Sequence, residues 1–288
     1  MPAARRRSPG ARTHAERLTS RDGYFAPESV IRRIGNSPLT PFLGGGPAVL
    51  MQVAHPLVAA GVTAHSDYRH HLWRRLVRTL RALYLITFGT KAEAERAGEA
   101  VQRVHAHVAG VTRERLGPFP PGTPYSASDP ELMLWVHGTL VECSLAVYGR
   151  FVRPLTRDEA ERYYREMAVV ARLFGLPAGT VPPTLRDFRE YLAEQLASGP
   201  IAVTPPARDV AAVILEAALP APMRLLVPAH RLSTAGLLPE RLREEYGLRW
   251  GRGRELGLRL AATSVRAAAT PVLIAASRLS PPAEALAA

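Results

Sequence analysis

The sequence predicts an all-α protein, and three observations lead to this class. Apolar residues recur with the period of an amphipathic helix nearly throughout the chain. No stretch alternates apolar and polar residues over the length of a strand, and neither a hairpin signal nor a repeat period is found. Helix-start signals recur, and glycine or proline separates the successive apolar segments.

The first half of the chain is expected to begin with a short helix over residues 27–34, opened by Pro27. The next apolar run must be kinked or split at Pro56, because proline lacks the backbone donor that a helix interior requires. Further amphipathic helices are expected over residues 71–89 and 91–111.

The second half carries two clear N-terminal helix signals. Asp129 is expected to cap a helix that has Pro130 at its first position. Thr156 and Glu159 have the spacing of a capping box and predict the start of the next long helix. Three or four further helices are expected within residues 207–275.

The expected connections are short and no clear linker is present. We therefore predict one large helical domain over residues 27–280, preceded by a basic, flexible N-terminus (1–26) and followed by a tail (281–288). A chain of 288 residues is long enough to bury a sizeable core.

The net charge of +12 would ordinarily indicate nucleic acid or an anionic membrane as partner. The only lysine is Lys91, however, and arginine together with abundant alanine, leucine, valine and proline indicates a coding bias. We expect no nucleic-acid binding. A single cysteine, Cys143, excludes an internal disulfide, and no secretory signal or membrane span is recognised, so a soluble, cytoplasmic protein is expected.

Several kinds of site are excluded by the motifs. The chain has no Walker lysine after its glycine-rich stretch, no G-x-S-x-G, no HExxH and no Glu-x-x-His pair, and one cysteine cannot build a zinc cluster. What remains is a set of histidines on apolar helices with arginines nearby. A haem pocket needs little more than one axial imidazole and an apolar cavity.

Taken as single residues, most of these histidines favour a structural interpretation. His55 precedes Pro56 and is expected to be a core histidine bonded to backbone that the proline frees. His65 is expected to be a hydrogen-bonding group at a helix end. His137 has apolar neighbours throughout, which favours a buried, hydrogen-bonded histidine.

Two other groups offer sharper alternatives. His105 and His107 lie about 200° apart around a helix, so they cannot serve one site from one side, and His105 is the more buried candidate. Arg75 and Thr79 lie one turn apart on the same helix face, and with Arg78 they are either a solvated stripe or a donor group.

Several segments occur in the order typical of one known family. These are QVAHPLVAAGVTAHSDY, RLVRTL, VHAHVAG and YSASDPELMLWVHGTLVECSLAVYGRFVRPL. Over residues 30–275 the chain resembles the MpaB-type oxygenase family, which shares its catalytic domain with rubber oxygenase, the latex-clearing protein. The resemblance implies a globin-like core that binds haem b. It also implies the oxidative cleavage of a carbon–carbon double bond by O2 in a polyprenyl substrate.

Position by position, the resemblance implies that His105 is the axial ligand of the iron. It places the distal donor pair on Arg75 and Thr79, with Arg78 in place of a lysine between them. The remaining candidates, His55, His65 and His137, are then residues that build the cofactor pocket.

Two departures from the family pattern are visible. Ala109 stands where rubber oxygenase has an arginine four residues after its axial histidine. A distal glutamate is also missing, because Asp67 is the only carboxylate between Glu28 and Glu93. The resemblance therefore implies that the catalytic base is either Asp67 or absent.

The resemblance thus implies a haem-dependent oxygenase acting on an apolar alkene or polyprenyl-type substrate. Two alternatives stay open. One is a haem protein with another redox or sensing role, and the other is a helical lipid- or nucleic-acid-binding protein without cofactor. Monomer and dimer are both compatible with the sequence.

Overall fold

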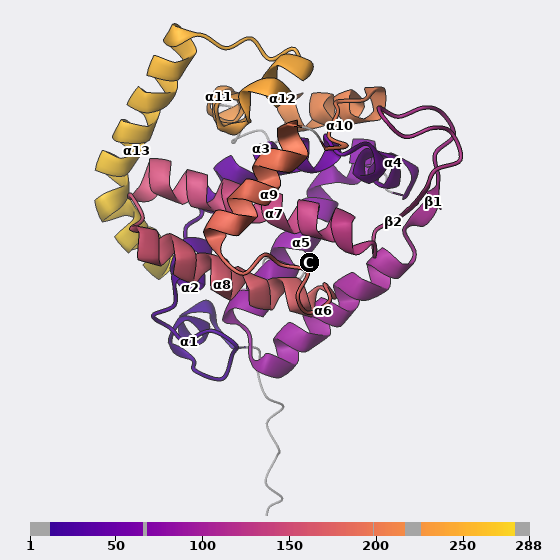
Figure 1. Cartoon of the computed structure of the whole chain (residues 1–288). Helices are drawn as coiled ribbons and strands as arrows, with labels where there is room; N and C mark the ends of the chain where they lie inside the picture. Colours follow the sequence, from indigo (N-terminus) through magenta and orange to yellow (C-terminus); the bar gives the residue numbers. More distant parts are fainter. Residues whose placement is uncertain (1–11, 66–67, 198, 217–225, 280–288) are drawn as a thin grey trace, which may run out of the picture.

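The computed structural model describes residues 12–65, 68–197, 199–216 and 226–279, with side chains outside 68–76 and 268–279, and it confirms the all-α class (Figure 1). In chain order the elements are α1 (His14–Thr19), α2 (Val30–Gly35), α3 (Leu39–Val53), α4 (Pro56–His65), α5 (Tyr68–Phe88), α6 (Lys91–Ala106), β1 (Ala109–Val111), β2 (Pro124–Ser126), α7 (Pro130–Val147), the π-helical turn η1 (Tyr148–Val152), α8 (Arg157–Leu173), α9 (Leu185–Ala197), α10 (Pro205–Glu216), α11 (Val227–Leu237), α12 (Glu240–Glu245) and α13 (Arg252–Leu279).

Helix α7 lies at the centre of the core, and different neighbours cover its different faces (Figure 1). On one face, Trp135 is buried and its Nε1–H donates to the carbonyl oxygen of Met51 on α3 at 3.1 Å. Three residues later, Gly138 lets α9 approach so closely that an added Cβ would lie 2.9 Å from the ring of Phe188. This apolar helix is therefore the frame around which the other helices pack.

The predicted break at Pro56 is confirmed. Helix α3 ends at Val53, α4 begins at Pro56, and their axes differ by 106°. The carbonyl oxygen of Ala54, which has no helical partner at this bend, accepts a hydrogen bond from the backbone N–H of Ala202 at 2.9 Å. The bend thus costs few backbone hydrogen bonds.

Both predicted N-terminal signals of the second half are confirmed. The Asp129 carboxylate accepts from the first backbone N–H groups of α7, and Pro130 occupies the first helical position. Thr156 and Glu159 form a reciprocal capping box at the start of α8. These signals act over three residues, so the local sequence is sufficient to predict them.

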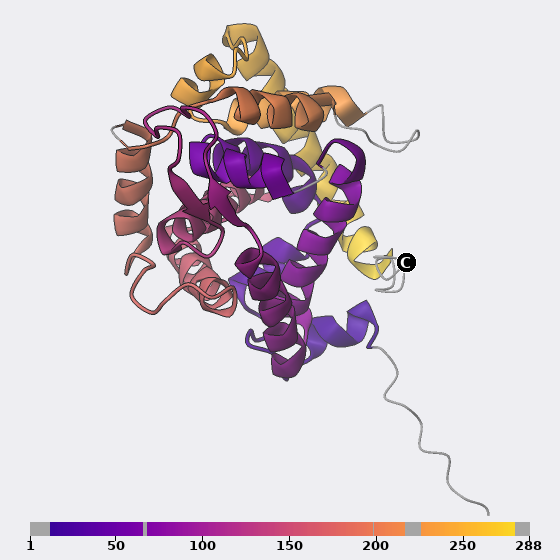
Figure 2. The same cartoon turned by 90° about the vertical axis from the view of Figure 1, so that its right-hand side faces the viewer.

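The expectation of a continuous helix over residues 91–111 is wrong at its end. Helix α6 stops at Ala106, and β1 then pairs antiparallel with β2 in the small hairpin visible in Figure 2. Gly110 is required here because an added Cβ would lie 2.7 Å from the hydroxyl oxygen of Tyr125 on β2. Strands of three residues are too short to give an alternating pattern. The expected helix over 27–34 likewise begins later, at Val30.

Residues 12–26 lie before the predicted domain boundary, yet they pack against the helical body. The Arg17 guanidinium makes two 2.8 Å hydrogen bonds to the Glu93 carboxylate at the start of α6. The His14 ring lies between the hydroxyl of Tyr84 (2.6 Å) and the side-chain oxygen of Asn36 (3.0 Å). Helix α1 is thereby fixed to α2, α5 and α6.

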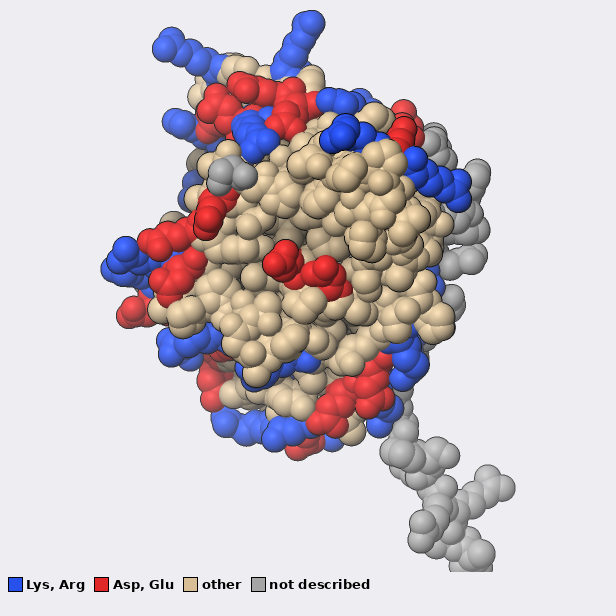
Figure 3. All heavy atoms as spheres, turned by 45° about the vertical axis from the view of Figure 1, so that its right-hand side comes forward, with Lys and Arg blue, Asp and Glu red and all other residues tan. Residues whose placement is uncertain are grey.

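Charged side chains are mixed on the face shown in Figure 3. Basic and acidic residues lie around its edge, and its broad, mostly uncharged centre carries a small group of acidic side chains but no basic one. Within the described part of the chain, one helical stretch, Pro130–Val152, is long and apolar enough to cross a membrane, and the bent pair α3–α4 passes the same test only as one span. Because 67% of the first stretch is buried inside the fold, it fits the core helix of a soluble protein.

Candidate functional site

Helix α6 carries the VHAHV block, and its N-terminal end is held firmly. Thr90 and Glu93 form a reciprocal capping box. The Glu93 carboxylate also accepts both hydrogen bonds from Arg17, and this guanidinium, together with the Thr90 contacts, lowers the pKa of Glu93 to about 2. The start of α6 is therefore anchored both by backbone capping and by an ion pair.

The middle of α6 lies against the end of α8. At Gly98 an added Cβ would clash with the carbonyl oxygen of Leu173, so only glycine allows this approach. One turn later, the Gln102 amide donates to the same carbonyl oxygen at 2.9 Å. Helix α8 ends at Leu173, and Gly175, with a φ of +98°, turns the chain away.

A pocket of about 510 Å³ opens beyond this contact, where α6 continues and α8 has ended. The half-buried His105 lines it, one turn after Gln102 on the same side of α6. The full lining is Glu99, Gln102, Arg103, His105, Ala106, Ser128, Met133, Phe174 and Gly175. The volume lies within the range of about 300 to 1,000 Å³ that is typical of small-molecule sites.

The two histidines of the VHAHV block differ as predicted. His105 is half-buried and lines the pocket, whereas His107 is exposed at the C-terminal cap of α6. The Nδ1 atom of His107 lies 2.6 Å from the carbonyl oxygen of Arg103, so its ring is used by the helix end. His105 is thus the member of the pair that is positioned to meet a ligand.

His55 fits the structural interpretation. It is buried in the bend between α3 and α4, where its Nδ1 accepts from the backbone N–H of Leu57 at 3.3 Å. Its ring also lies against that of Phe119, with centroids 5.7 Å apart. Burial lowers the pKa of His55 to about 4, so the ring is neutral at physiological pH.

His65 also fits the structural interpretation. It is exposed at the last position of α4, and its Nε2 lies 3.2 Å from the hydroxyl oxygen of Tyr125. This contact joins the end of α4 to the hairpin strand β2. Like His55, His65 does not line the pocket that contains His105.

His137 differs from the expectation. It is buried, with 3% of its surface exposed, but neither ring nitrogen has a hydrogen-bond partner among the described side chains and backbone groups. Burial lowers its pKa to about 4, so this ring too is neutral. The predicted burial is confirmed, while no described residue supplies the predicted hydrogen bond. His137 lies one turn after the pocket residue Met133 on α7.

The residues predicted on and before α5 are placed only in part. Arg78 and Thr79 are exposed on this helix, and neither lines the pocket that contains His105. Arg75 lies on α5 with its side chain outside the described residues, and Asp67 falls outside them altogether. The assignment of a distal donor pair and of a base therefore stays a prediction.

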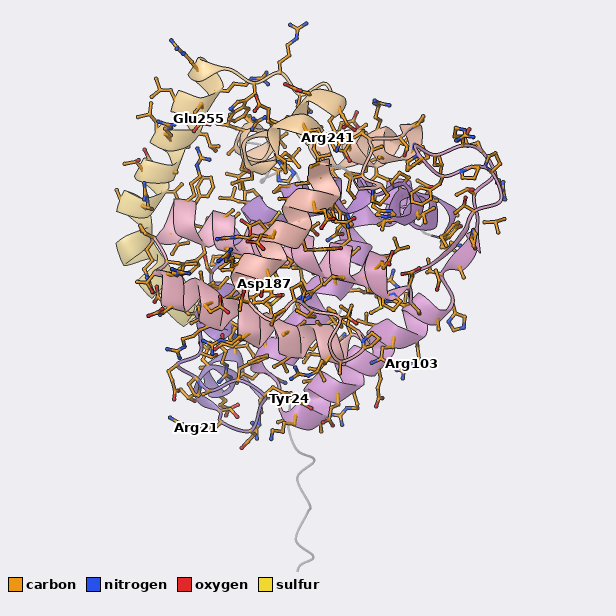
Figure 4. All side chains as sticks on the ribbon, in the orientation of Figure 1. Arg21, Tyr24, Arg103, Asp187, Arg241 and Glu255 are labelled. Atoms are coloured by element: carbon orange, nitrogen blue, oxygen red, sulfur yellow. The ribbon has the colours of Figure 1, made fainter. Side chains whose placement is uncertain are left out.

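A haem would need one imidazole and an apolar wall from this pocket. His105 offers an imidazole, and Met133 and Phe174 supply apolar wall, while Gln102 and Arg103 supply polar groups at the edge. Arg103 lies on the outer side of α6 (Figure 4). In the described part of the chain, no group of three or more His, Cys, Asp or Glu side chains could hold a bare metal ion. A haem iron takes four ligands from its macrocycle and needs only one imidazole from the protein.

Sequence reasoning did not identify Met133 or Phe174 as pocket residues. Each is an apolar residue in an apolar segment and looks like ordinary core. They meet His105 only because α8 ends beside α6 and the chain then turns at Gly175. No local signal could have revealed this meeting of three elements.

Comparison with known proteins supports the resemblance seen in the sequence. The family model for the catalytic domain of ER-bound oxygenase mpaB/B′ and rubber oxygenase matches residues 32–267, which is 236 of the 288 residues. Searches of curated proteins and of solved structures found no match. The match covers most of the helical body, including α6, α7 and the pocket between them. The chain therefore belongs to the mpaB/rubber oxygenase catalytic-domain family, a family of oxygenases.

Proposed function

We propose that this protein is a haem b-dependent oxygenase in which His105 is the axial ligand of the iron. Its substrate is an apolar, alkene-bearing molecule of the polyprenyl type, which O2 cleaves or oxygenates at a carbon–carbon double bond. The observation that carries the proposal is the position of His105. This imidazole lines a pocket to which Met133 and Phe174 contribute apolar side chains, in a domain of an oxygenase family.

Different residues of the chain would ligate the iron, exclude water and contact the propionates. Bound haem supplies an iron centre for oxygen chemistry. His105 would hold the iron, and its place on α6 is set by the anchored N-terminal half of that helix. Met133 and Phe174 would exclude water from the macrocycle, while Arg103 at the edge would lie near the charged propionates.

The donors for developing negative charge are assigned to α5. Arg75 and Thr79 lie one turn apart, so a guanidinium and a hydroxyl can act from one face of the helix. Arg78 supplies a further cation beside them. Asp67 is the candidate base, and Ala109 leaves this chain without the arginine that rubber oxygenase has near its axial histidine.

The remaining parts of the proposal follow from composition and surface. The single cysteine, Cys143, is buried and free, which fits a reducing cytoplasm. The face shown in Figure 3 carries no continuous basic patch, which favours an apolar small molecule over nucleic acid as partner on that face.

The decisive experiment is titration of the purified protein with haemin, followed in the Soret region. We expect the wild type to bind one haem per chain without covalent attachment, since no Cys-x-x-Cys-His motif is present. His105→Ala should lose haem, and His107→Ala, the matched control two residues away, should keep it. An unchanged spectrum in His105→Ala would show that another residue ligates the iron.

The same titration and an assay of O2 consumption separate the alternatives. A wild type without any Soret shift would favour the lipid- or nucleic-acid-binding protein without cofactor. Haem binding without consumption of O2 in the presence of a reductant and a polyprenyl substrate would favour a redox or sensing role.

A further inference from the structure

Helix α13 carries apolar side chains on two opposite faces. Its inner face packs against η1 and α11, where Leu258 and Ala262 are buried and Val265 packs beside them. Its outer face carries Leu256 and Leu260, with 57% and 59% of their surfaces exposed. In Figure 1, α13 runs along one edge of the molecule, and no described helix covers its outer side. The second apolar face is therefore in contact with solvent.

The two exposed leucines form a continuous feature. Six large hydrophobic side chains are exposed in the described part of the chain, and of these only Leu256 and Leu260 lie one turn apart on one helix. Thr263 and Ala267, which are also exposed, continue the same line toward the C-terminus. We call these four residues the outer stripe. Single exposed apolar residues are normal, whereas a neighbouring group at a helix surface indicates a partner.

A row of arginines follows one border of the outer stripe. Arg252, Arg259 and Arg266 are spaced by seven residues, which is close to two helical turns, so they lie on the same side of α13. Residues 249–267 contain five arginines and one glutamate, which gives this short segment a net charge of +4. The uncharged stripe therefore lies beside concentrated positive charge.

The acidic residue of this segment does not neutralise the whole border. Glu255, labelled in Figure 4, is already shared between Arg150 at 2.8 Å and Arg259 at 2.9 Å. Arg249 and Arg254, at the start of α13, are exposed and form no ion pair with a described residue. Their charges are therefore available to an anionic partner.

A neutral apolar stripe beside a basic border has a well-defined complement. It fits a helix that lies in the interface of an anionic bilayer, where apolar side chains enter the acyl region and guanidinium groups remain at the phosphates. A second copy of this chain fits less well, because it would bring the same arginine row and no spare carboxylate on this face.

We propose that α13 docks the protein onto an anionic lipid bilayer. The helix would lie parallel to the surface, with Leu256 and Leu260 among the acyl chains and the arginine row at the phosphates. The segment from Arg252 to Ala267 is about 24 Å long, so it spans several lipid headgroups. This docking needs no haem and is independent of the proposed cofactor site. Apolar polyprenyl-type molecules dissolve in bilayers, so docking would also bring the protein to the proposed class of substrate.

The test is sedimentation of the purified full-length protein with lipid vesicles at physiological salt. We expect binding to vesicles of phosphatidylcholine mixed with phosphatidylglycerol, and much weaker binding to phosphatidylcholine alone. Leu256→Ser/Leu260→Ser should lower the partition coefficient by about tenfold or more. Arg252→Gln/Arg259→Gln should lower it by about fivefold for each arginine on the mixed vesicles, and this difference should vanish in about 1 M salt.

The chain offers matched controls at the opposite edge of the molecule, where the hairpin lies (Figure 1). Val104→Ser/Val111→Ser removes two side chains that are as exposed as the leucines, at 60% and 58%. Arg113→Gln/Arg115→Gln removes two exposed arginines that follow β1, and so the same total charge. Both double variants should bind the mixed vesicles like the wild type.

A variant with the opposite effect guards against loss of folding. Leu260→Trp should strengthen binding by about twofold to fivefold, because indole rings favour the membrane interface. Thermal midpoints near that of the wild type would show that the serine and glutamine variants are folded, as expected for substitutions at exposed positions.

Three results would overturn the inference. The first is a wild type that does not bind the mixed vesicles. The second is an equal loss of binding in the α13 variants and in the hairpin controls, which would assign the binding to the total charge of the chain. The third is a lipid-free dimer that Leu256→Ser/Leu260→Ser dissociates while vesicle binding is unchanged, which would make the outer stripe an interface between two copies. None of these results would affect the haem titration, so the two proposals fail separately.

Discussion

The two ends of α6 are built in opposite ways. At the N-terminal end, a capping box and a paired guanidinium fix the helix, and the Arg17 side chain is only 6% exposed. At the C-terminal end, Val104 is 60% exposed, and the ion pair between Glu99 and Arg103 is long (3.8 Å) and open to solvent. The predicted iron ligand lies at this second, loosely held end.

The difference indicates that the N-terminal end of α6 fixes the helix in the fold, whereas its C-terminal end carries the candidate site. A ligand-binding residue needs a rigid element to position it and some local mobility where the ligand enters. Binding residues are therefore often found in the less stable parts of a fold. The contacts of Glu93 and Gly98 determine the position and direction of α6. The position of His105 is therefore set by residues that do not line the pocket.

Among the substitutions that test this contrast between the two ends of α6, Glu93→Gln has the largest expected effect. The change leaves the buried Arg17 guanidinium without its counter-charge, and we expect a loss of about 2 to 3 kcal/mol in the free energy of unfolding. Urea unfolding of the apo protein measures it. The double variant Arg17→Met/Glu93→Gln should recover much of the loss, since the cost comes from the unpaired charge.

Lowering the pH should weaken the same ion pair between Arg17 and Glu93. Because the pKa of folded Glu93 is lowered to about 2, its contribution is complete above about pH 4.5 and is lost as the pH falls toward 2. The difference in stability between wild type and Glu93→Gln should narrow over that window. A difference that stays constant down to pH 2 would show that the ion pair does not anchor α6.

The next largest effect is expected at Gly98. A Cβ at this position meets the carbonyl oxygen of Leu173, which belongs to backbone and cannot move aside, so Gly98→Ala should cost about 1 to 3 kcal/mol. It should also weaken haem binding by displacing His105. Gly45→Ala on α3 is the control: no heavy atom lies within 4 Å of the added Cβ, and stability should rise by about 0.5 to 1 kcal/mol. Unchanged haem affinity in Gly98→Ala would show that the α6–α8 contact does not position the site.

These contacts also mark the limit of what the sequence could predict. The starts of α7 and α8 were predictable because Asp129 and Thr156 act on backbone within three residues. The break at Pro56 was predictable because proline acts on its own helix. The end of α6 at Ala106 was not, since the hairpin that follows depends on Tyr125, which packs over Gly110 from fifteen residues away.

The site shows the same division. The ranking of His105 above His107 followed from helical geometry, which is local. The pocket itself depends on Met133 and Phe174, which reach α6 only through the packing of α7 and α8. That no described residue bonds the buried ring of His137 is likewise a property of everything that surrounds it. Local patterns therefore identify the helix that carries the predicted iron ligand, whereas only the packed structure identifies the residues that line the pocket.

The smallest expected effect lies at the open end of α6. Glu99 and Arg103 form an exposed pair, with 63% and 68% of their side-chain surfaces accessible, so Glu99→Gln should change stability by less than about 0.5 kcal/mol. Both residues line the pocket, however, and removal of the negative charge should favour the anionic propionates of haem. We expect haem affinity to rise by about twofold at low ionic strength, and the gain should vanish in about 1 M salt, where charges are screened within about 3 Å. An equal gain at both salt concentrations would point to a change in packing.

A loss of stability as large as that of Glu93→Gln would remove the contrast between the two ends, because Glu99 would then hold the helix as Glu93 does.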